Sequence, residues 1–215
     1  MSVKRHRFIG ALSAGALGLA LAAPAVAQPL PDRPRERVVE LAHQAAVSAA
    51  IDSLPKQLKG FYKAHRMEMP SLALEPEFPV RGPERRFLVD RLLPFPFREL
   101  PRTETEIKTR FGEKADGLGR LPWLIHESYT RLLEAMKASD REKVLAESDV
   151  LGGLVVDVHS PLNLTDNYDG QKTGQHGLWV RLVEKLPQAM GKELRVSADA
   201  ANYLDNPKEY VFSMM

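Results

Sequence analysis

The chain has 215 residues, of which 30 are Lys or Arg and 28 are Asp or Glu, and it contains no cysteine. The absence of cysteine excludes disulfides, a thiolate nucleophile and cysteine-ligated zinc or iron–sulfur centres. Three of the basic residues and none of the acidic ones fall within residues 1–27, so the remaining chain has 30 − 3 = 27 basic groups against 28 acidic ones. This near-neutral balance gives no support to nucleic-acid binding.

Residues 1–27 have the pattern of a secretory signal peptide. A basic start is followed by an apolar run from Phe8 to Ala23 and by Ala25-Val26-Ala27, after which cleavage is expected. The run is shorter than the roughly 20 apolar residues of a membrane-spanning helix, and no later stretch is longer or more apolar. We therefore expect a periplasmic or secreted protein with no membrane span after cleavage and with an exposed, Pro-rich lead-in over residues 28–37.

The remaining 215 − 27 = 188 residues suit a single domain, and their apolar spacing is helical. The spacing predicts helices over residues 35–53, after Pro55, after Pro122, from about 179 to 186 and near residues 196–204. Ser139 to Glu142 fits a capping box that opens a further helix running to about His159. Because strand alternation is scarce, the predicted fold class is all-α, with one helical domain over residues 38–215.

Prolines interrupt this pattern over residues 69–102, which predicts a long irregular insertion. Four arginines make the insertion basic and could meet an anionic head group or phosphate: Arg81, Arg85, Arg86 and Arg91. A solvated loop is the simpler interpretation of such a charge run.

The densest group of polar side chains follows, between Asp157 and His176. A helix that ends in Asp157 and His159 and leads into a polar loop is a reasonable place for a functional site. The alternative is that these side chains bond loop backbone groups and that residues 167–170 form only a turn. Composition alone favours the alternative.

The run from Leu151 to Gln175 nevertheless resembles the metal-site region of the zinc-dependent phospholipase C and single-strand nuclease family. Three further stretches resemble the bacterial branch of that family in the same order: Ala42-His43 with Leu54-Pro55, Gly60-Phe61-Tyr62-Lys63, and Phe111-Gly112-Glu113 with Leu121-Pro122-Trp123. The resemblance implies an all-α exported phosphodiesterase in which three clustered zinc ions polarise a phosphate and activate a water.

The resemblance also implies which residues would bind metal. His43, Asp157 and His176 stand at ligand positions, with Glu75 as a further remnant, while His159, Asn163, Asn167 and Asp169 belong to the site region. Five other ligand positions have lost their ligand. Val38 replaces an N-terminal Trp, Gly153 and Asn163 replace histidines, Val180 replaces a carboxylate, and a histidine is missing near Arg86 or Phe87.

Catalytic zinc needs about three protein ligands and structural zinc needs four, and two ligands with water would hold it weakly. We therefore expect a relative that has lost most of its metal site, for which zinc is a doubtful cofactor and catalysis is absent or weak. The alternative is an active metal-dependent phosphodiesterase built on His43, Asp157 and His176. A phosphate-containing ligand suits either interpretation, whereas the substrate class and the oligomeric state stay open.

Without metal, the predicted site residues need other partners. Asp157 lies in the last turns of a largely apolar helix, where an unpaired carboxylate is costly to bury. Arg86, Arg181 and His159 are candidate partners by residue type. The chain also ends earlier than the family usually does, so residues 211–215 are expected to cover surface that further helices would otherwise occupy, unless the gene is truncated.

Overall fold

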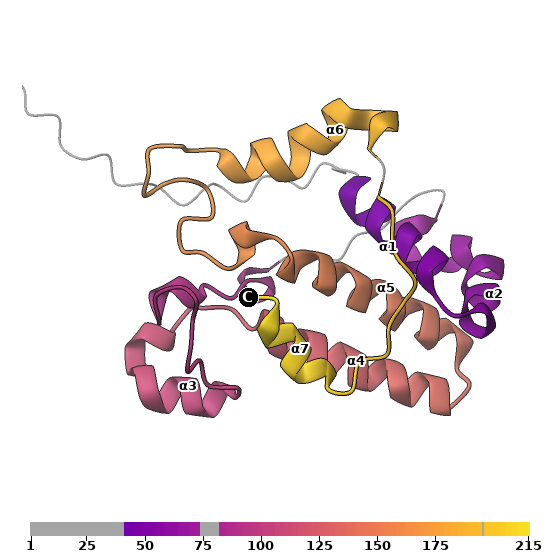
Figure 1. Ribbon diagram of the computed structural model, residues 1–215, viewed down its shortest axis with the longest axis horizontal. Coiled ribbons are helices and arrows are strands. Elements are labelled where there is room, and N and C mark those ends of the chain that lie inside the picture. The colour runs from indigo at the N-terminus through magenta and orange to yellow at the C-terminus, as the bar shows by residue number, and fades with distance from the viewer. Residues whose placement is uncertain (1–40, 74–81, 195) are drawn as a thin grey trace, which may run out of the picture. The chain divides into compact units, whose positions relative to one another are not determined.

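The computed structural model describes residues 41–73, 82–194 and 196–215 (Figure 1). The chain divides into two units, residues 1–33 and 34–215, and all described residues belong to the second. Within them the regular structure is helical and contains no strand, which confirms the predicted all-α class. The predicted signal peptide, the lead-in over residues 28–37 and Glu75 lie outside the described residues.

Two helices follow the lead-in, α1 (Leu41–Ser53) and α2 (Lys56–Ala64), and both coincide with predicted helices. The 3₁₀ turns η1 (Arg66–Glu68) and η2 (Pro70–Leu72) then return the chain to α1. There the side-chain amide of Gln44 donates to the backbone carbonyl of Ser71 over 2.8 Å. This hydrogen bond holds η2 against α1, and residues of both elements pack into the same hydrophobic cluster.

The described residues of the 69–102 segment are irregular, as predicted, and part of them is buried in the core. After the turns η3 (Pro83–Arg85) and η4 (Val89–Arg91), the chain passes through a cis peptide bond at Phe95–Pro96. Phe87 and Val89 are fully buried, and their backbone N–H groups donate to the carbonyls of Asn163 and Leu164. The segment is thereby attached to the chain that follows the longest helix. The solvated-loop interpretation is wrong for Arg85, which is buried, but agrees with Arg91, which is exposed, while Arg81 lies outside the described residues.

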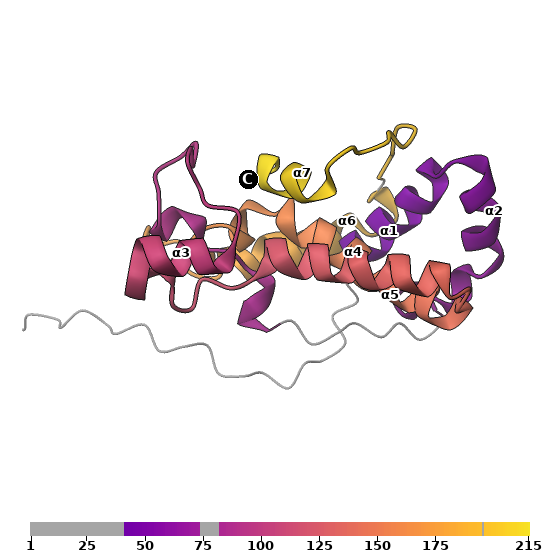
Figure 2. The ribbon, with the colours of Figure 1, turned by 90° about the horizontal axis from the view of Figure 1, so that it is seen from below.

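The central pair of helices is α4 (Leu121–Lys137) and α5 (Arg141–Val158), which lie side by side in Figures 1 and 2. They follow α3 (Glu104–Phe111) and the turn η5 (Gly112–Ala115). The predicted capping box lies in the right place, but the capping residue is Asp140, whose carboxylate accepts from the Lys143 N–H. Ser139 instead takes a left-handed conformation with φ of 53° in the tight turn between the helices.

The chain after α5 consists of short helices: η6 (Pro161–Asn163), the π-helix η7 (Val180–Lys185), α6 (Leu186–Met190), the 3₁₀ turn η8 (Gly191–Glu193) and α7 (Pro207–Ser213). The helix predicted near residues 196–204 is wrong. Residues 196–204 are all exposed, Tyr203 to 89%, so a helix there would gain nothing from burying its apolar side chains. The helix begins later, where Asn206 caps the N–H of Glu209 and Pro207 occupies the first turn.

The C-terminal helix α7 packs against α4. Val211 and Phe212 of α7 are buried, and the Phe212 ring meets Trp123 of α4 edge-on at 6.2 Å between centroids. The residues from 211 onward therefore cover part of the helical core, as predicted. No described helix combines the length and the apolar character that crossing a membrane requires.

Candidate functional site

One face of α5 carries three residues at four-residue spacing, Asp149, Gly153 and Asp157. Such spacing brings side chains to the same face of a helix. Asp149 and Asp157 are only 3% and 2% exposed. Because an ionised carboxylate is costly to bury alone, this face must find polar partners on the elements packed against it.

The partner of Asp157 is Arg85, the last residue of η3. Its Nε donates to Oδ2 of Asp157 over 2.7 Å, and its Nη2 lies 2.6 Å from the same oxygen. Arg85 is itself only 7% exposed, so this is a buried ion pair. The pair joins the irregular segment to the end of α5.

The three candidate partners suggested by residue type make other contacts. Arg86 follows Arg85 in the chain but stacks over the Tyr168 ring at 3.9 Å. Arg181 donates to the backbone carbonyls of Gln175 and His176. The ring Nδ1 of His159 donates to the carbonyl of Val155, one turn back in α5, and the side chain is exposed.

His43 of α1 occupies the space above Gly153. A Cβ added to Gly153 would lie 2.3 Å from Cε1 of His43 and 3.1 Å from Nη2 of Arg85. His43 is 2% exposed. The structure thus brings His43 and Asp157, two of the predicted ligands, to a common place around Arg85, and it leaves no room there for a side chain at position 153. We call His43, Arg85, Asp149, Gly153 and Asp157 the polar centre.

Asp149 binds Ser71 of η2. Its Oδ2 accepts from the Ser71 N–H over 3.2 Å, and its Oδ1 accepts from the Ser71 hydroxyl. Ser, His and Asp are the residue types of a hydrolytic triad, yet here the serine hydroxyl is bound to the carboxylate and Ser71 is fully buried. The arrangement does not present a nucleophile, and it holds η2 against α5.

Burial raises the pKa of Asp149 above the ordinary aspartate value of 3.8, while the Ser71 hydrogen bonds and the charge of His43 oppose the rise. The folded carboxyl group then keeps its proton to higher pH than the unfolded one, so this group's contribution to stability falls as the pH rises from 3.8 through the folded pKa. Asp149→Asn cannot ionise. We expect the stability of the wild type relative to Asp149→Asn to decrease over that range, measured by urea unfolding from about pH 3 to 8.

Asp140→Asn is the control, because the pH dependence of stability that it reports should have the opposite sign. The backbone hydrogen bond from Lys143 lowers the pKa of Asp140, so its contribution is present above 3.8 and is lost as the pH falls through the lower folded pKa. The wild type should therefore gain stability relative to Asp140→Asn as the pH rises. A wild-type advantage over Asp149→Asn that also grows with pH would contradict the assignment of the raised pKa.

The remaining site-region residues hold the loop after α5 in shape. The Asn163 amide donates to the Asp157 carbonyl over 2.9 Å. The Asp169 carboxylate accepts from the backbone N–H groups of Gly177 and Trp179. The Asn167 side chain accepts from the Lys172 N–H and donates to the hydroxyl of Thr173. These contacts agree with the turn over residues 167–170 in the alternative weighed above, but not with its other half, because the Asp157 carboxylate pairs with Arg85 and His159 bonds a carbonyl of α5 instead of loop backbone groups.

His176 is not part of the polar centre as described. Its side chain is exposed, and its carbonyl accepts from Arg181. Among residues 41–73, 82–194 and 196–215, no three His, Asp or Glu side chains form a group suited to a metal ion.

The polar centre as arranged does not fit zinc. Oδ2 of Asp157 is taken by a guanidinium, Gly153 offers no donor atom, and a permanent cation stands beside His43. A divalent ion placed there would be repelled by Arg85 in a medium that screens charge poorly. The positive charge beside Asp157 is instead supplied by the guanidinium of Arg85.

Sequence reasoning missed three residues of this arrangement. Asp149 could have been found, because it stands four and eight residues before Gly153 and Asp157 on a helix that was predicted. Arg85 was noticed only as part of a basic loop. Nothing in the sequence singles out Ser71.

No protein-family model matches this chain, and no curated protein or solved structure is significantly similar to it. The function is therefore argued from the polar centre and from the resemblance in its sequence.

Proposed function

We propose that this protein is an exported helical relative of the zinc-dependent phospholipase C and nuclease family that acts by binding and does not hydrolyse phosphodiesters. In this proposal the Arg85 guanidinium takes the place of a metal cation beside Asp157. The observation that carries it is the buried ion pair between Arg85 and Asp157, in which both guanidinium contacts reach Oδ2 at 2.6–2.7 Å. This pair lies beside His43 and Gly153, two positions at which the resembling family has metal ligands.

A guanidinium can replace the charge of a metal but not its chemistry. It neutralises a buried carboxylate and fixes its orientation through hydrogen bonds. It does not act as a Lewis acid toward water, so it cannot generate the hydroxide that metal-dependent phosphodiesterases use. A centre built on Arg85 therefore supports the fold and has no group that would activate an attacking water.

The rival function is an active phosphodiesterase with a reduced metal site. One observation favours it, because His43 and Asp157 do lie around one point. For this function Arg85 would have to withdraw and a third ligand would have to approach. Only the rival function predicts a phosphodiesterase activity that a chelator abolishes, so a chelator experiment distinguishes the two.

The test is hydrolysis of bis(4-nitrophenyl) phosphate and of a short-chain phosphatidylcholine by the purified full chain, with zinc and with a chelator. We expect the same background rate in all conditions, for the wild type and for His43→Gln. Turnover that zinc supports, that the chelator abolishes and that His43→Gln lowers at least tenfold would overturn the non-catalytic proposal. Circular dichroism of each protein checks that the variant is folded.

Export is proposed from the leader pattern alone. Expression with the leader, cell fractionation and N-terminal sequencing test it. We expect a periplasmic or secreted product that begins at Gln28. A cytoplasmic product that retains residues 1–27 would contradict export and leave the argument on the polar centre unchanged.

A further inference from the structure

An exposed apolar row runs along the continuous helix that η7 and α6 form. Its members are Leu182, Leu186 and Met190, which follow one another at four-residue spacing and are 45%, 48% and 37% exposed. Such spacing places side chains on one face of a helix. One exposed leucine is ordinary on a protein surface, but three large apolar side chains in line form a continuous surface of the kind that marks an interaction site. We call these three residues the apolar row.

The helix packs on the protein with a different side. Pro187 is buried, and Val183, which lies one turn before it, is half-buried. The helix therefore carries apolar side chains beyond those that it needs for packing. A π-helix such as η7 is also uncommon, and π-helical turns occur frequently at functional sites.

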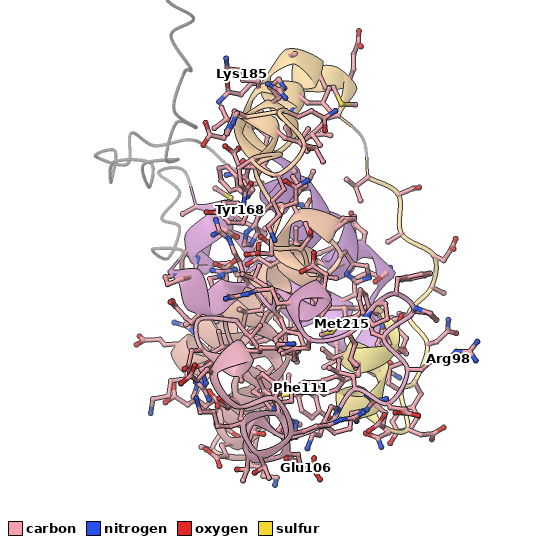
Figure 3. All side chains as sticks on the ribbon, turned by 90° about the vertical axis from the view of Figure 1, so that its left-hand side faces the viewer. Arg98, Glu106, Phe111, Tyr168, Lys185 and Met215 are labelled. Atoms are coloured by element: carbon pink, nitrogen blue, oxygen red, sulfur yellow. The ribbon has the colours of Figure 1, made fainter. Side chains whose placement is uncertain are left out.

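A row of cations runs beside the apolar row. Arg181 and Lys185 are four residues apart, and each directly precedes a leucine of the apolar row. Both are exposed, and Figure 3 shows Lys185 projecting outward from this helix. The Arg181 guanidinium donates to the backbone carbonyls of Gln175 and His176, which fix its position without neutralising its charge.

The carboxylates near this helix lie away from the cations. Glu184 is half-buried, and its position two residues after Leu182 places it on the other side of the helix. Glu193 is exposed but stands in η8, after the end of the apolar row. The ion pairs found in the described part of the chain include neither Arg181 nor Lys185. The face that carries the apolar row is therefore bordered by positive charge.

This pattern fits an anionic bilayer better than a protein partner. An apolar helix face bordered by Lys and Arg is typical of helices that lie in the interfacial layer of a membrane. A partner helix would instead be held in a groove. The apolar row lines neither the cleft beside Phe95 nor the cleft beside Gln44 in the described chain. A bilayer is deformable and can receive a projecting row without a groove.

We propose that the protein binds the surface of a bilayer that contains anionic phospholipid, through the helix over residues 180–190. The apolar row enters the boundary between head groups and acyl chains, and the two cations pair with lipid phosphates. Trp179, one turn before the apolar row, lies at the end of the helix where an aromatic ring suits the interfacial layer. The site shares no residue with the polar centre, so its failure would leave the proposed function unchanged.

Co-sedimentation with vesicles of phosphatidylcholine, with and without phosphatidylglycerol, tests the proposal on the chain that begins at Gln28. The leader is left out because its apolar run would bind lipid by itself, and the described helices all belong to the unit over residues 34–215. We expect binding that requires phosphatidylglycerol. Binding should be at least tenfold weaker for Leu182→Ser/Leu186→Ser and about fivefold weaker for Lys185→Gln.

Matched variants outside the helix serve as controls. Leu133→Ser/Met136→Ser changes two apolar side chains of α4 that are each 37% exposed, and Lys143→Gln changes a lysine of α5 that is 75% exposed. Both should bind vesicles as the wild type does. Circular dichroism and urea unfolding check that every variant is folded.

A fluorescence measurement locates the contact without any change to the apolar row. The chain has two tryptophans, Trp123 and Trp179. Trp123 packs edge-on against Phe87 and Phe212, whereas Trp179 begins the helix that we propose to meet lipid. Phospholipids brominated in their acyl chains quench only rings that approach them. We expect them to quench the fluorescence of the wild type and not that of Trp179→Phe.

Several results would overturn the proposal. One is the absence of binding to vesicles with phosphatidylglycerol. Another is equal binding by Leu182→Ser/Leu186→Ser, or equal binding without phosphatidylglycerol, because the apolar row or the cations would then have no role. Quenching that persists in Trp179→Phe would place the contact elsewhere. A wild-type dimer that does not bind vesicles, and that the double serine variant converts to monomer, would make the apolar row an interface between copies of the chain.

Discussion

Asp157→Asn is expected to lower the free energy of unfolding by about 3–5 kcal/mol. The reason is that Arg85 would remain 7% exposed with its guanidinium no longer facing a carboxylate. Breaking a buried pair by removing one charge is far more costly than replacing both partners. Urea unfolding followed by circular dichroism measures the loss.

Two comparisons separate this effect from a general loss of stability. Lys108→Met removes an ion pair with Asp116 whose side chains are 57% and 66% exposed, and it should cost less than about 1 kcal/mol. The double variant Arg85→Met/Asp157→Leu removes both buried charges and should recover much of the loss. An Asp157→Asn variant within about 1 kcal/mol of the wild type would show that the pair does not stabilise the fold.

Gly153→Ala is the second large effect, and its sign distinguishes tertiary packing from helix propensity. Alanine favours a helix over glycine by about 1 kcal/mol, so propensity alone predicts stabilisation. The structure predicts the reverse, because the new Cβ would lie 2.3 Å from Cε1 of His43. We expect a net loss of about 1–3 kcal/mol, as in other overpacked cores, measured by urea unfolding.

Gly60→Ala is the matched control. Gly60 lies inside α2, and a Cβ added there would meet no atom within 4 Å. We expect this variant to gain about 0.5–1 kcal/mol from propensity. If both alanine variants stabilise the protein, His43 does not occupy the space above Gly153 as described.

The helices were the most predictable part of the fold. Apolar residues at helical spacing identified α1 and α4, which each bury several of them, and also α2, which buries only Tyr62. The capping box before Glu142 identified α5. The prediction failed near residues 196–204, where apolar residues suggested a helix but every side chain is exposed and nothing packs against the segment. The signal that marks α7 is its cap, Asn206 followed by Pro207, rather than a stripe.

The segment over residues 69–102 shows why burial was harder to predict than irregularity. Its prolines correctly indicated a chain without regular helices, but they say nothing about where the chain runs. Phe87 and Val89 pack into the hydrophobic core, and the carbonyls at 163 and 164 accept their backbone N–H groups, so these contacts join positions more than seventy residues apart. Whether Arg85 or Arg86 faces the core depends on the turn at η3, which has no periodic pattern to reveal it.

The structure brings together only part of the site predicted from the sequence. His43 and Asp157 were chosen from the resemblance, and the structure places them together. His176 was chosen in the same way, but its side chain is exposed and it does not lie with the residues around Arg85. Asn163, Asn167 and Asp169 bond backbone groups of the loop, whereas Asp157, for which the simpler interpretation expected the same, pairs with Arg85.

The most direct test of the account is the zinc content of the purified protein after dialysis against trace zinc, measured by mass spectrometry. With Arg85 in place of a metal, we predict far less than one equivalent in the wild type and the same in Asp157→Ala, with the folded helical signal checked in both. Zinc near one equivalent in the wild type that is lost in a folded Asp157→Ala variant would contradict the account. It would show that Asp157 binds a metal and that Arg85 does not take its place.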